Sequence, residues 1–289
     1  MNMILSLRRG RRVNRSFLGT FALFLFLAVF GAFMALPLVF AINAAFKPLD
    51  EIFLFPPRLF VRNPTLDNFI DLVELLGNSW VPFTRYIFNT VFITGVGVVG
   101  HVIFASAAAY PLAKHKFPGR NVLFQIVVLS LMFSPAVTSI PNYMVMSWLG
   151  FVDTYWAVIL PAFAYSLGLY LMKQFMEQIP DALLEAAKID GASEYRIFWS
   201  VVMPNVKPAW LTLIILVFQI LWGTDGNGFI YSEQLKTLHF ASNQIIQGGI
   251  ARAGVGAAVA LILMSVPITI FIFSQSRIIE TMATSGMKD

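Results

Sequence analysis

Long apolar stretches alternate with polar segments along the whole chain. A helix needs about 20 mostly apolar residues to cross a bilayer. Six stretches reach or approach that length, at 17–42, 86–109, 121–140, 155–172, 209–222 and 255–273. The fifth is the shortest, because it runs into a Gly-rich polar segment at 223–228. The pattern predicts an all-α, polytopic membrane protein with six transmembrane helices.

The composition agrees with this pattern and excludes a soluble enzyme. Of the 289 residues, 58% are apolar and 12% are charged, against roughly 45–50% and about 25% in an ordinary globular protein. A water-soluble fold of this size could not bury so much apolar surface. The first apolar stretch is also too long for a cleaved signal peptide, so we expect it to remain as a span.

The distribution of basic residues sets the expected sidedness. Most of the 20 Lys and Arg residues fall in the N-terminal tail and after the second, fourth and sixth spans. Because such residues favour cytoplasmic loops, both termini are expected in the cytoplasm. The expected division is a cytoplasmic N-terminal tail (1–16), a first transmembrane helix (17–42), an extracytoplasmic loop with a short helix (43–85), a transmembrane core (86–273) that includes a cytoplasmic loop (173–207), and a cytoplasmic C-terminal tail (274–289).

Candidate catalytic chemistry is absent from the sequence. The chain has no Cys, its three His residues show no metal-ligand spacing, and it contains no phosphate-binding loop of the G-x-x-x-x-G-K-[ST] type. No nucleophile, base and orienting group can be assembled into a set. We therefore expect no catalytic residue, metal site or cofactor site in this chain. Energy for uphill transport would have to come from another subunit.

The predicted spans contain no Asp, Glu, Lys or Arg, and His101 is their only histidine. Proton-driven carriers usually need ionisable groups within the membrane, which disfavours a secondary carrier. Neutral polar or aromatic side chains could line a path for a hydroxyl-rich solute; the candidates are Asn89, Ser134, Asn142, Gln219 and Trp222. The alternative is that such groups hydrogen-bond neighbouring helices.

The loop at 173–207 predicts a helix–turn–helix. Pro180 suits the first turn of a helix, and Asp181 suits the positive end of its dipole. Gly191 stands where a left-handed C-terminal cap is expected. Ser193 can then cap a second helix, which is expected to run to about residue 203 and to end at Pro204.

The spacing within this loop resembles the EAA–x3–G–x9–I–x–LP loop of ATP-binding-cassette importer permeases. The matching residues are Glu185, Ala186, Ala187, Gly191, Val201, Met203 and Pro204, with Val201 in place of Ile and Met203 in place of Leu. Further stretches, at 43–47, 67–69, 85–90, 109–113, 117–120, 140–143 and 189–192, resemble the carbohydrate-uptake permeases of the maltose-transporter type, second-permease branch. The segment 223–225 and the ending 280–289 depart from that pattern.

The resemblance implies a type I ABC importer permease fold in a bacterial cytoplasmic (inner) membrane. It also implies the partners: a second permease subunit, two ATPase subunits that use ATP and Mg, an extracytoplasmic solute-binding protein, and a sugar or oligosaccharide substrate, with no nucleic acid. Contact with the ATPase would involve Glu185, Ala186, Ala187, Asp190, Gly191 and Pro204. The outer loops, 43–85 and 224–254, would dock the binding protein.

Three other functions remain open at this point. One is a permease of an ABC importer for another small polar solute, such as an amino acid or phosphate. A secondary carrier is less favoured, because the spans lack charge. A membrane scaffold would need neither polar residues in its spans nor a loop for an ATPase, and co-purification with an ATPase would separate it from the importer.

Overall fold

The computed structural model describes residues 17–77, 80–226 and 228–285, and the regular elements among these residues are all helices, with no β-strand. The expected N-terminal tail, and the last four residues of the C-terminal tail, lie outside the described residues. The main helices are α1 (Phe17–Ala45), α3 (Asp67–Gly77), α4 (Phe83–Lys114), α5 (Arg120–Ser130), α6 (Pro135–Trp148), α7 (Trp156–Phe163), α8 (Ser166–Glu177), α9 (Asp181–Ile189), α12 (Lys207–Trp222), α13 (Leu238–Gln247) and α14 (Ala253–Ser285). Short helices are α2 (Leu49–Ile52), α10 (Glu194–Ile197), η1 (Phe198–Val202), α11 (Met203–Asn205), η2 (Glu233–Leu235) and η3 (Ile250–Arg252).

Four of the six predicted spans fall on long helical segments, the third falls on a bent helix pair, and the fifth falls on one member of a second bent pair. Within the described residues, α1, α4, the 156–177 segment and α14 are each long and apolar enough to cross a membrane. The pair α5 and α6 bends by 114°, and the helical segment 194–205 meets α12 at 78°. The all-α, polytopic prediction is confirmed. The third predicted span is broken into α5 and α6, whereas the fifth, 209–222, lies within the single helix α12.

The break between α5 and α6 has a local cause in the sequence. Ser134 precedes Pro135, and a residue before proline avoids the helical region. Ser134 accordingly adopts an extended ψ of 143°, and its side chain caps α6 by accepting a hydrogen bond from the amide of Ala136. The sequence prediction of one helix over 121–140 missed this Ser–Pro signal.

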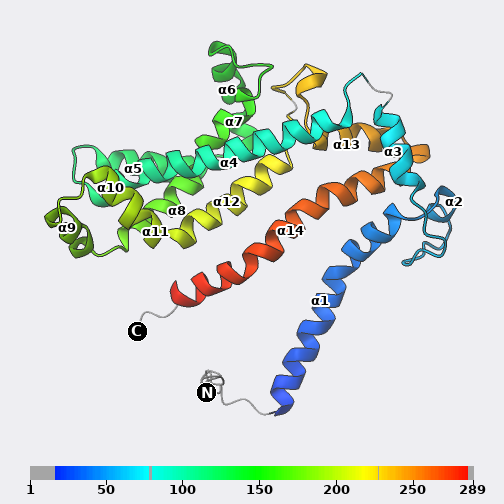
Figure 1. Cartoon of the computed structure of the whole chain (residues 1–289), viewed down its shortest axis with the longest axis horizontal. Helices are drawn as coiled ribbons and strands as arrows, with labels where there is room; N and C mark the ends of the chain where they lie inside the picture. Colours follow the sequence, from blue (N-terminus) through cyan, green and yellow to red (C-terminus); the bar gives the residue numbers. More distant parts are fainter. Residues whose placement is uncertain (1–16, 78–79, 227, 286–289) are drawn as a thin grey trace, which may run out of the picture.

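Helix α4 runs beside α7, α8 and α12 (Figure 1), and glycines allow close approaches between α4 and each of these three helices. A Cβ at Gly97 would overlap the side chain of Leu221 on α12, and one at Gly100 would overlap Phe163 on α7. At the third approach the glycine lies on the neighbouring helix: His101 of α4 fills the space beside Gly168 on α8. These close approaches pack α4, α7, α8 and α12 into one unit.

Short elements gather at the two ends of α4 (Figure 1). Helices α9, α10 and α11 lie near its C-terminal end, while α3 and α13 lie toward its N-terminal end. The sequence prediction treated 224–254 as a loop and missed α13, although Thr237 caps it and Leu238, Ala241 and Ile245 form its buried face. That three-and-four spacing is the signal that could have found it.

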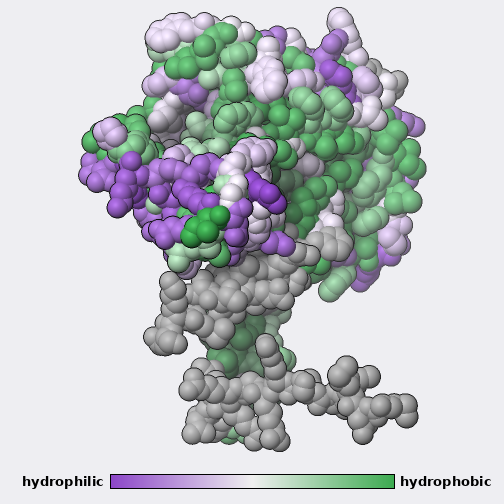
Figure 2. Space-filling model, turned by 60° about the vertical axis from the view of Figure 1, so that its left-hand side comes forward, coloured by the Kyte–Doolittle hydropathy of each residue, from purple (hydrophilic) through white to green (hydrophobic). Residues whose placement is uncertain are grey.

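The apolar surface is largely exposed on the isolated chain. The apolar window of α1 has no buried residue, and Met146 is the only buried residue of α6. Figure 2 brings the α9 end forward and shows hydrophilic residues over that end, with hydrophobic residues over the flanks. The flanks therefore suit lipid or another apolar protein surface, and the α9 end suits water or a polar partner.

Candidate functional site: the coupling loop

The loop between α8 and α12, within 173–207, is called the coupling loop below, and it adopts the predicted helix–turn–helix. Pro180 precedes α9, and the turn that follows α9 has Gly191 at a left-handed φ of 78°. The amide of Ala192 donates to the carbonyl of Ala187 at 3.0 Å, which closes the C-terminal cap. Ser193 then accepts a hydrogen bond from the amide of Arg196 and caps α10. The predicted left-handed cap at Gly191 and the predicted helix cap at Ser193 are confirmed.

The inner face of this loop is part of the largest apolar cluster. Leu184 of α9 belongs to the same cluster as buried residues of α4, α8, α10, η1 and α12, among them Met172, Met176, Ile197, Val202 and Leu213. Leu184 is 7% exposed, whereas Met172 and Met176 are fully buried. Burying a side chain of this size contributes about 1.5–3 kcal/mol, so α9 is attached to the helical bundle through this face.

An ion pair fixes the start of α9 to the end of α4. The buried ammonium of Lys114 lies 2.7 Å from Oδ1 of Asp181, and it also donates to the carbonyl of Ile179. The hydrogen bond and the charge of Lys114 lower the pKa of Asp181 below its ordinary value. Glu177, at the end of α8, is held in the same way by Lys173 at 2.6 Å and by Arg120 at 3.5 Å.

Glu194 fixes the other end of α9. Its carboxylate accepts a hydrogen bond from the hydroxyl of Tyr110 at 2.9 Å, and it lies 2.7 Å from Nζ of Lys188 and 3.6 Å from Nε2 of His115. The hydrogen bond from Lys188 makes the largest contribution to lowering the pKa of Glu194. The hydrogen bond from Tyr110 and the nearby positive charges add to it, and together they outweigh burial, which would raise this pKa. Tyr110, Lys114 and Glu194 were not singled out in the sequence, because their partners are distant along the chain.

The outer face of the loop is free. Glu185, Ala186 and Asp190 are exposed, and Ala187 is half-buried. Within the described part of the chain, Glu185 makes no hydrogen bond or ion pair. Beside it, Ile189 is 86% exposed, and Tyr195 on α10 is 75% exposed. An unpaired carboxylate between small and large apolar side chains is a surface that another protein can cover.

Pro204 does not end the second helix, in contrast to the sequence prediction. The helical run continues through η1, a π-helical turn, into α11, and the break falls at Val206. Because Pro204 has no amide hydrogen, it cannot continue the ordinary ladder. The wider π turn over Phe198–Val202 accommodates this, and Trp210 donates its indole N–H to the carbonyl of Met203 at 3.1 Å.

The structure does not bring the five candidate path residues together. Ser134 and Asn142 belong to the α5–α6 pair, Gln219 and Trp222 to α12, and no hydrogen bond joins these two groups in the described residues. Trp222 is nearly buried and donates to the carbonyl of Leu263 at 3.0 Å. Gln219 is exposed and Asn142 is half-buried.

The side chain of Asn89 forms hydrogen bonds within the protein. It is fully buried, and its amide nitrogen donates to the carbonyls of Gln234 and Lys236 at 2.9 and 2.7 Å. Its side-chain oxygen accepts a hydrogen bond from the hydroxyl of Tyr155 at 2.7 Å. With these groups occupied, Asn89 holds the segment before α13 against α4, as the helix-bonding alternative expected.

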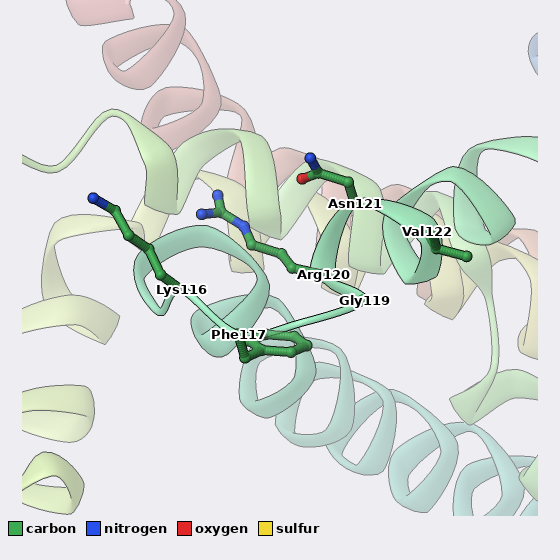
Figure 3. Close-up of a pocket in the computed structure, with 6 residues that line it drawn as sticks. All are labelled: Lys116, Phe117, Gly119, Arg120, Asn121 and Val122. Atoms are coloured by element: carbon green, nitrogen blue, oxygen red, sulfur yellow. The ribbon is translucent and has the colours of Figure 1, made fainter.

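A shallow basic pocket lies between α4 and α5, near the loop (Figure 3). It has a volume of about 310 Å³ and is lined by Lys116, Phe117, Gly119, Arg120, Asn121 and Val122. The guanidinium of Arg120 already donates hydrogen bonds to the carbonyls of Leu112 and Ala113.

No group of three His, Asp or Glu residues that could hold a metal ion occurs in the described chain.

Comparison with known proteins identifies the family of this chain. Residues 101–283 match the family model described as binding-protein-dependent transport system inner membrane component. The arabinooligosaccharides transport system permease protein AraQ of Halalkalibacterium halodurans is 30% identical over 280 residues, which cover 93% of this chain and 94% of AraQ. A crystal structure of a bacterial ABC transporter involved in the import of the acidic polysaccharide alginate contains a chain with a TM-score of 0.76 at 21% identity, covering 92% of this chain and 99% of that one. A second crystal structure, of the alginate ABC transporter in complex with an alginate pentasaccharide-bound periplasmic protein, gives a TM-score of 0.59 at 18% identity over 90% and 94% of the two chains. With its multiple apolar helices and this match over most of its length, the chain belongs to the family of inner-membrane components of binding-protein-dependent transport systems.

Proposed function

We propose that this chain is a permease subunit of an ATP-driven importer for a sugar or oligosaccharide. The observation that carries the proposal is the coupling loop, whose inner face is fixed to α4, α8 and α12 while its outer face, around Glu185, is exposed and unpaired. A partner that pushes on this loop therefore moves the bundle rather than the loop alone. The carbohydrate names of AraQ and of the alginate transporter support the substrate class.

The partners follow from the exposed surfaces. Two ATPase subunits, which bind ATP and Mg themselves, would serve the transporter, one of them contacting Glu185, Ala186, Ala187, Asp190 and Gly191. A second permease would cover apolar residues of α5 and α6, where large side chains are exposed along both helices. An extracytoplasmic binding protein would deliver the sugar at the opposite end, where α3 and α13 lie.

The sidedness belongs to the same proposal. The α9 end carries exposed Lys116, Lys188, Arg196 and Lys207, and basic residues of this kind favour the cytoplasmic side. We infer that the coupling loop and both termini face the cytoplasm and that α3 and α13 face outward. The bent pair of α5 and α6 then counts as the third span, and α12 alone counts as the fifth, with 194–205 in the cytoplasmic loop.

Co-purification and energised uptake test this function. A tagged chain expressed with the genes that neighbour it should retain an ATPase subunit through detergent extraction. Uptake into vesicles that contain ATP should continue when a protonophore collapses the proton gradient. An ATPase-free preparation that loses uptake with the gradient would instead establish a secondary carrier. Radiolabelled oligosaccharides, amino acids and phosphate, compared in the same vesicles, distinguish a sugar importer from a permease for another polar solute.

A further inference from the structure

Two buried tyrosines occupy equivalent positions at opposite ends of α4. Tyr86, in its first turn, donates its hydroxyl to Oε1 of Glu233 at 2.6 Å, and Tyr110, near its last turn, donates to Oε2 of Glu194 at 2.9 Å. Both tyrosines are less than a tenth exposed. At 1.5 Å per residue, their positions are about 36 Å apart along the helix axis.

Each hydrogen bond connects α4 to a different functional end of the molecule. Glu194 belongs to the coupling loop and is paired with Lys188 of α9. Glu233 opens η2, the 3₁₀ turn that leads through residue 237 into α13. The segment 233–238, which we call the η2 segment, therefore meets α4 at the end opposite to the coupling loop.

The η2 segment is attached to α4 at several points. Arg85 donates to the carbonyl of Gln234 at 3.1 Å, and the amide of Leu238 donates to the hydroxyl of Thr90 at 2.8 Å. Asn89 adds its two hydrogen bonds to the same segment. Because Arg85, Tyr86, Asn89 and Thr90 occupy two successive turns of one helix, a shift of α4 must carry the segment with it.

Helix α4 is suited to transmit such a shift. It is continuous from Phe83 to Lys114, and its one proline, Pro111, lies in the last turn. Two of its three glycines are filled from outside, Gly97 by Leu221 and Gly100 by Phe163, and Gly95 alone has open space beside it. Packed interiors move as rigid bodies between discrete arrangements rather than deforming continuously.

We propose that Tyr86 and Tyr110 are positioning residues that make α4 the element transmitting motion from the coupling loop to the η2 segment. This inference rests on the proposed function, because it needs an ATPase that moves α9. The two hydrogen bonds act in series: displacement of α9 passes through Glu194 to Tyr110, along α4, and from Tyr86 to Glu233.

A single-cysteine reporter tests the transmission without knowledge of the sugar. The chain has no native Cys, so Gln234→Cys, at an exposed side chain whose backbone carbonyl stays in place, supplies one labelling site in this chain. The complete transporter, purified through its ATPase and reconstituted, is labelled with a membrane-impermeant maleimide without nucleotide and after trapping with Mg-ATP and vanadate. We expect the labelling rate to differ between the two states.

The tyrosine variants then locate the pathway. Tyr86→Phe and Tyr110→Phe each remove one hydrogen bond to a charged group. The labelling ratio is the rate in the trapped state divided by the rate without nucleotide, and each variant should reduce the departure of this ratio from one by about tenfold. Because the contacts act in series, the double variant should lose no more than the worse single variant. Tyr170→Phe is the matched control, since that half-buried hydroxyl makes no hydrogen bond in the described residues. Glu233→Gln retains an acceptor for Tyr86 but removes its charge, so it should reduce the difference between the two states less than Tyr86→Phe does, whereas a purely steric role of Glu233 predicts no change.

The outcomes separate this inference from the proposed function. A reporter whose labelling is the same in both states, or tyrosine variants that keep the wild-type ratio, would overturn the transmission role alone. So would losses that multiply in the double variant, because these indicate two independent local effects. If no ATPase co-purifies, or vanadate traps no nucleotide, the proposed function itself is overturned and the inference with it.

Discussion

Lys188 and Glu194 form an ion pair across the turn at Gly191, with Nζ and Oε1 2.7 Å apart. The pair joins the last turn of α9 to the first turn of α10, so it sets the angle between the two helices together with the left-handed backbone at Gly191. Both constraints fix the orientation of the exposed outer face that carries Glu185. Substitutions in the turn should therefore affect partner binding more than membrane insertion.

The first prediction concerns Gly191. A Cβ at this position would meet no neighbouring atom within 4 Å, so a substitution is opposed by the backbone conformation alone. A left-handed conformation costs an ordinary residue about 1–2 kcal/mol, and Asn tolerates it best. ATPase co-purification should decrease in the order Gly191, Gly191→Asn, Gly191→Ala, Gly191→Val at equal protein level in the membrane. Equal retention of the ATPase by the Asn and Val variants would contradict a left-handed requirement.

The second prediction concerns Glu185. Its carboxylate has no partner in the described chain, so Glu185→Ala should leave the thermal stability of the chain within about 0.5 kcal/mol of wild type. In a dehydrated contact with the ATPase, loss of one member of a charged pair costs roughly 2–5 kcal/mol. Co-purified ATPase should consequently fall more than about tenfold.

The choice of control for Glu185 depends on the structure. Glu177 and Glu194 look equivalent to Glu185 in the sequence, but both are paired with neighbouring helices, and their removal would disturb the loop itself. Glu74 on α3 is exposed and lies toward the opposite end of α4, so Glu74→Ala is the matched control for ATPase binding. Glu185→Ala and Glu74→Ala retaining the same amount of ATPase would show that Glu185 is not a coupling residue.

These controls show which part of the site could be predicted from the sequence. Pro180, Gly191 and Ser193 act on their own turns within a few residues, so their spacing was enough to predict the shape of the loop. One partner of Glu194 is Tyr110, 84 residues away, and no local pattern reveals a contact of that separation. The bend at Ser134 carried a local signal in its Ser–Pro pair, whereas the burial of Asn89 depends on the η2 segment folding back onto α4.

The third prediction concerns sidedness. Lys116, beside the coupling loop, and Asn63, in the segment between α2 and α3, are both exposed. Since the chain has no native Cys, Lys116→Cys and Asn63→Cys each provide one labelling site. In intact cells an impermeant maleimide should label Asn63→Cys alone, and Lys116→Cys should react only after the membrane is opened. Labelling of both sites from outside would refute the inferred orientation.

The fourth prediction concerns the pH dependence of a contact outside the coupling loop. Asp153 accepts hydrogen bonds from the amides of Tyr231 and Ser232 at 2.9 and 2.8 Å and from the hydroxyl of Ser232. Burial alone would raise the pKa of Asp153, but these hydrogen bonds and the charge of Lys236 outweigh it and lower the pKa from its ordinary 3.8. A lowered carboxyl pKa stabilises the folded segment above pH 3.8, and this stabilisation is lost as the pH falls through the lowered value.

Hydrogen exchange of the 229–232 amides measures this effect. After correction for intrinsic rates, their protection should be constant above about pH 5 and should decrease toward pH 3. Asp153→Asn keeps an acceptor and tolerates the left-handed φ of 61°, but it carries no titrating charge, so its protection should be weaker and independent of pH. An identical pH profile for wild type and Asp153→Asn would exclude Asp153 as the titrating group.

The last prediction compares two glycines in the helical bundle. Gly168 on α8 faces the ring of His101 and the side chain of Leu213, both fully buried, so an added methyl group must displace one of them. Overpacking of this kind costs typically about 1–3 kcal/mol. It would also move His101, whose Nδ1 lies 2.9 Å from the carbonyl of Ala162 near the break between α7 and α8. Gly95 on α4 has open space where a Cβ would lie. Gly95→Ala should therefore raise the free energy of unfolding by about 0.5–1 kcal/mol through helix propensity. Thermal unfolding in detergent should therefore show a lower Tm for Gly168→Ala and an equal or higher Tm for Gly95→Ala. A Gly168→Ala variant as stable as wild type would mean that His101 and α8 do not pack as closely as the structure places them.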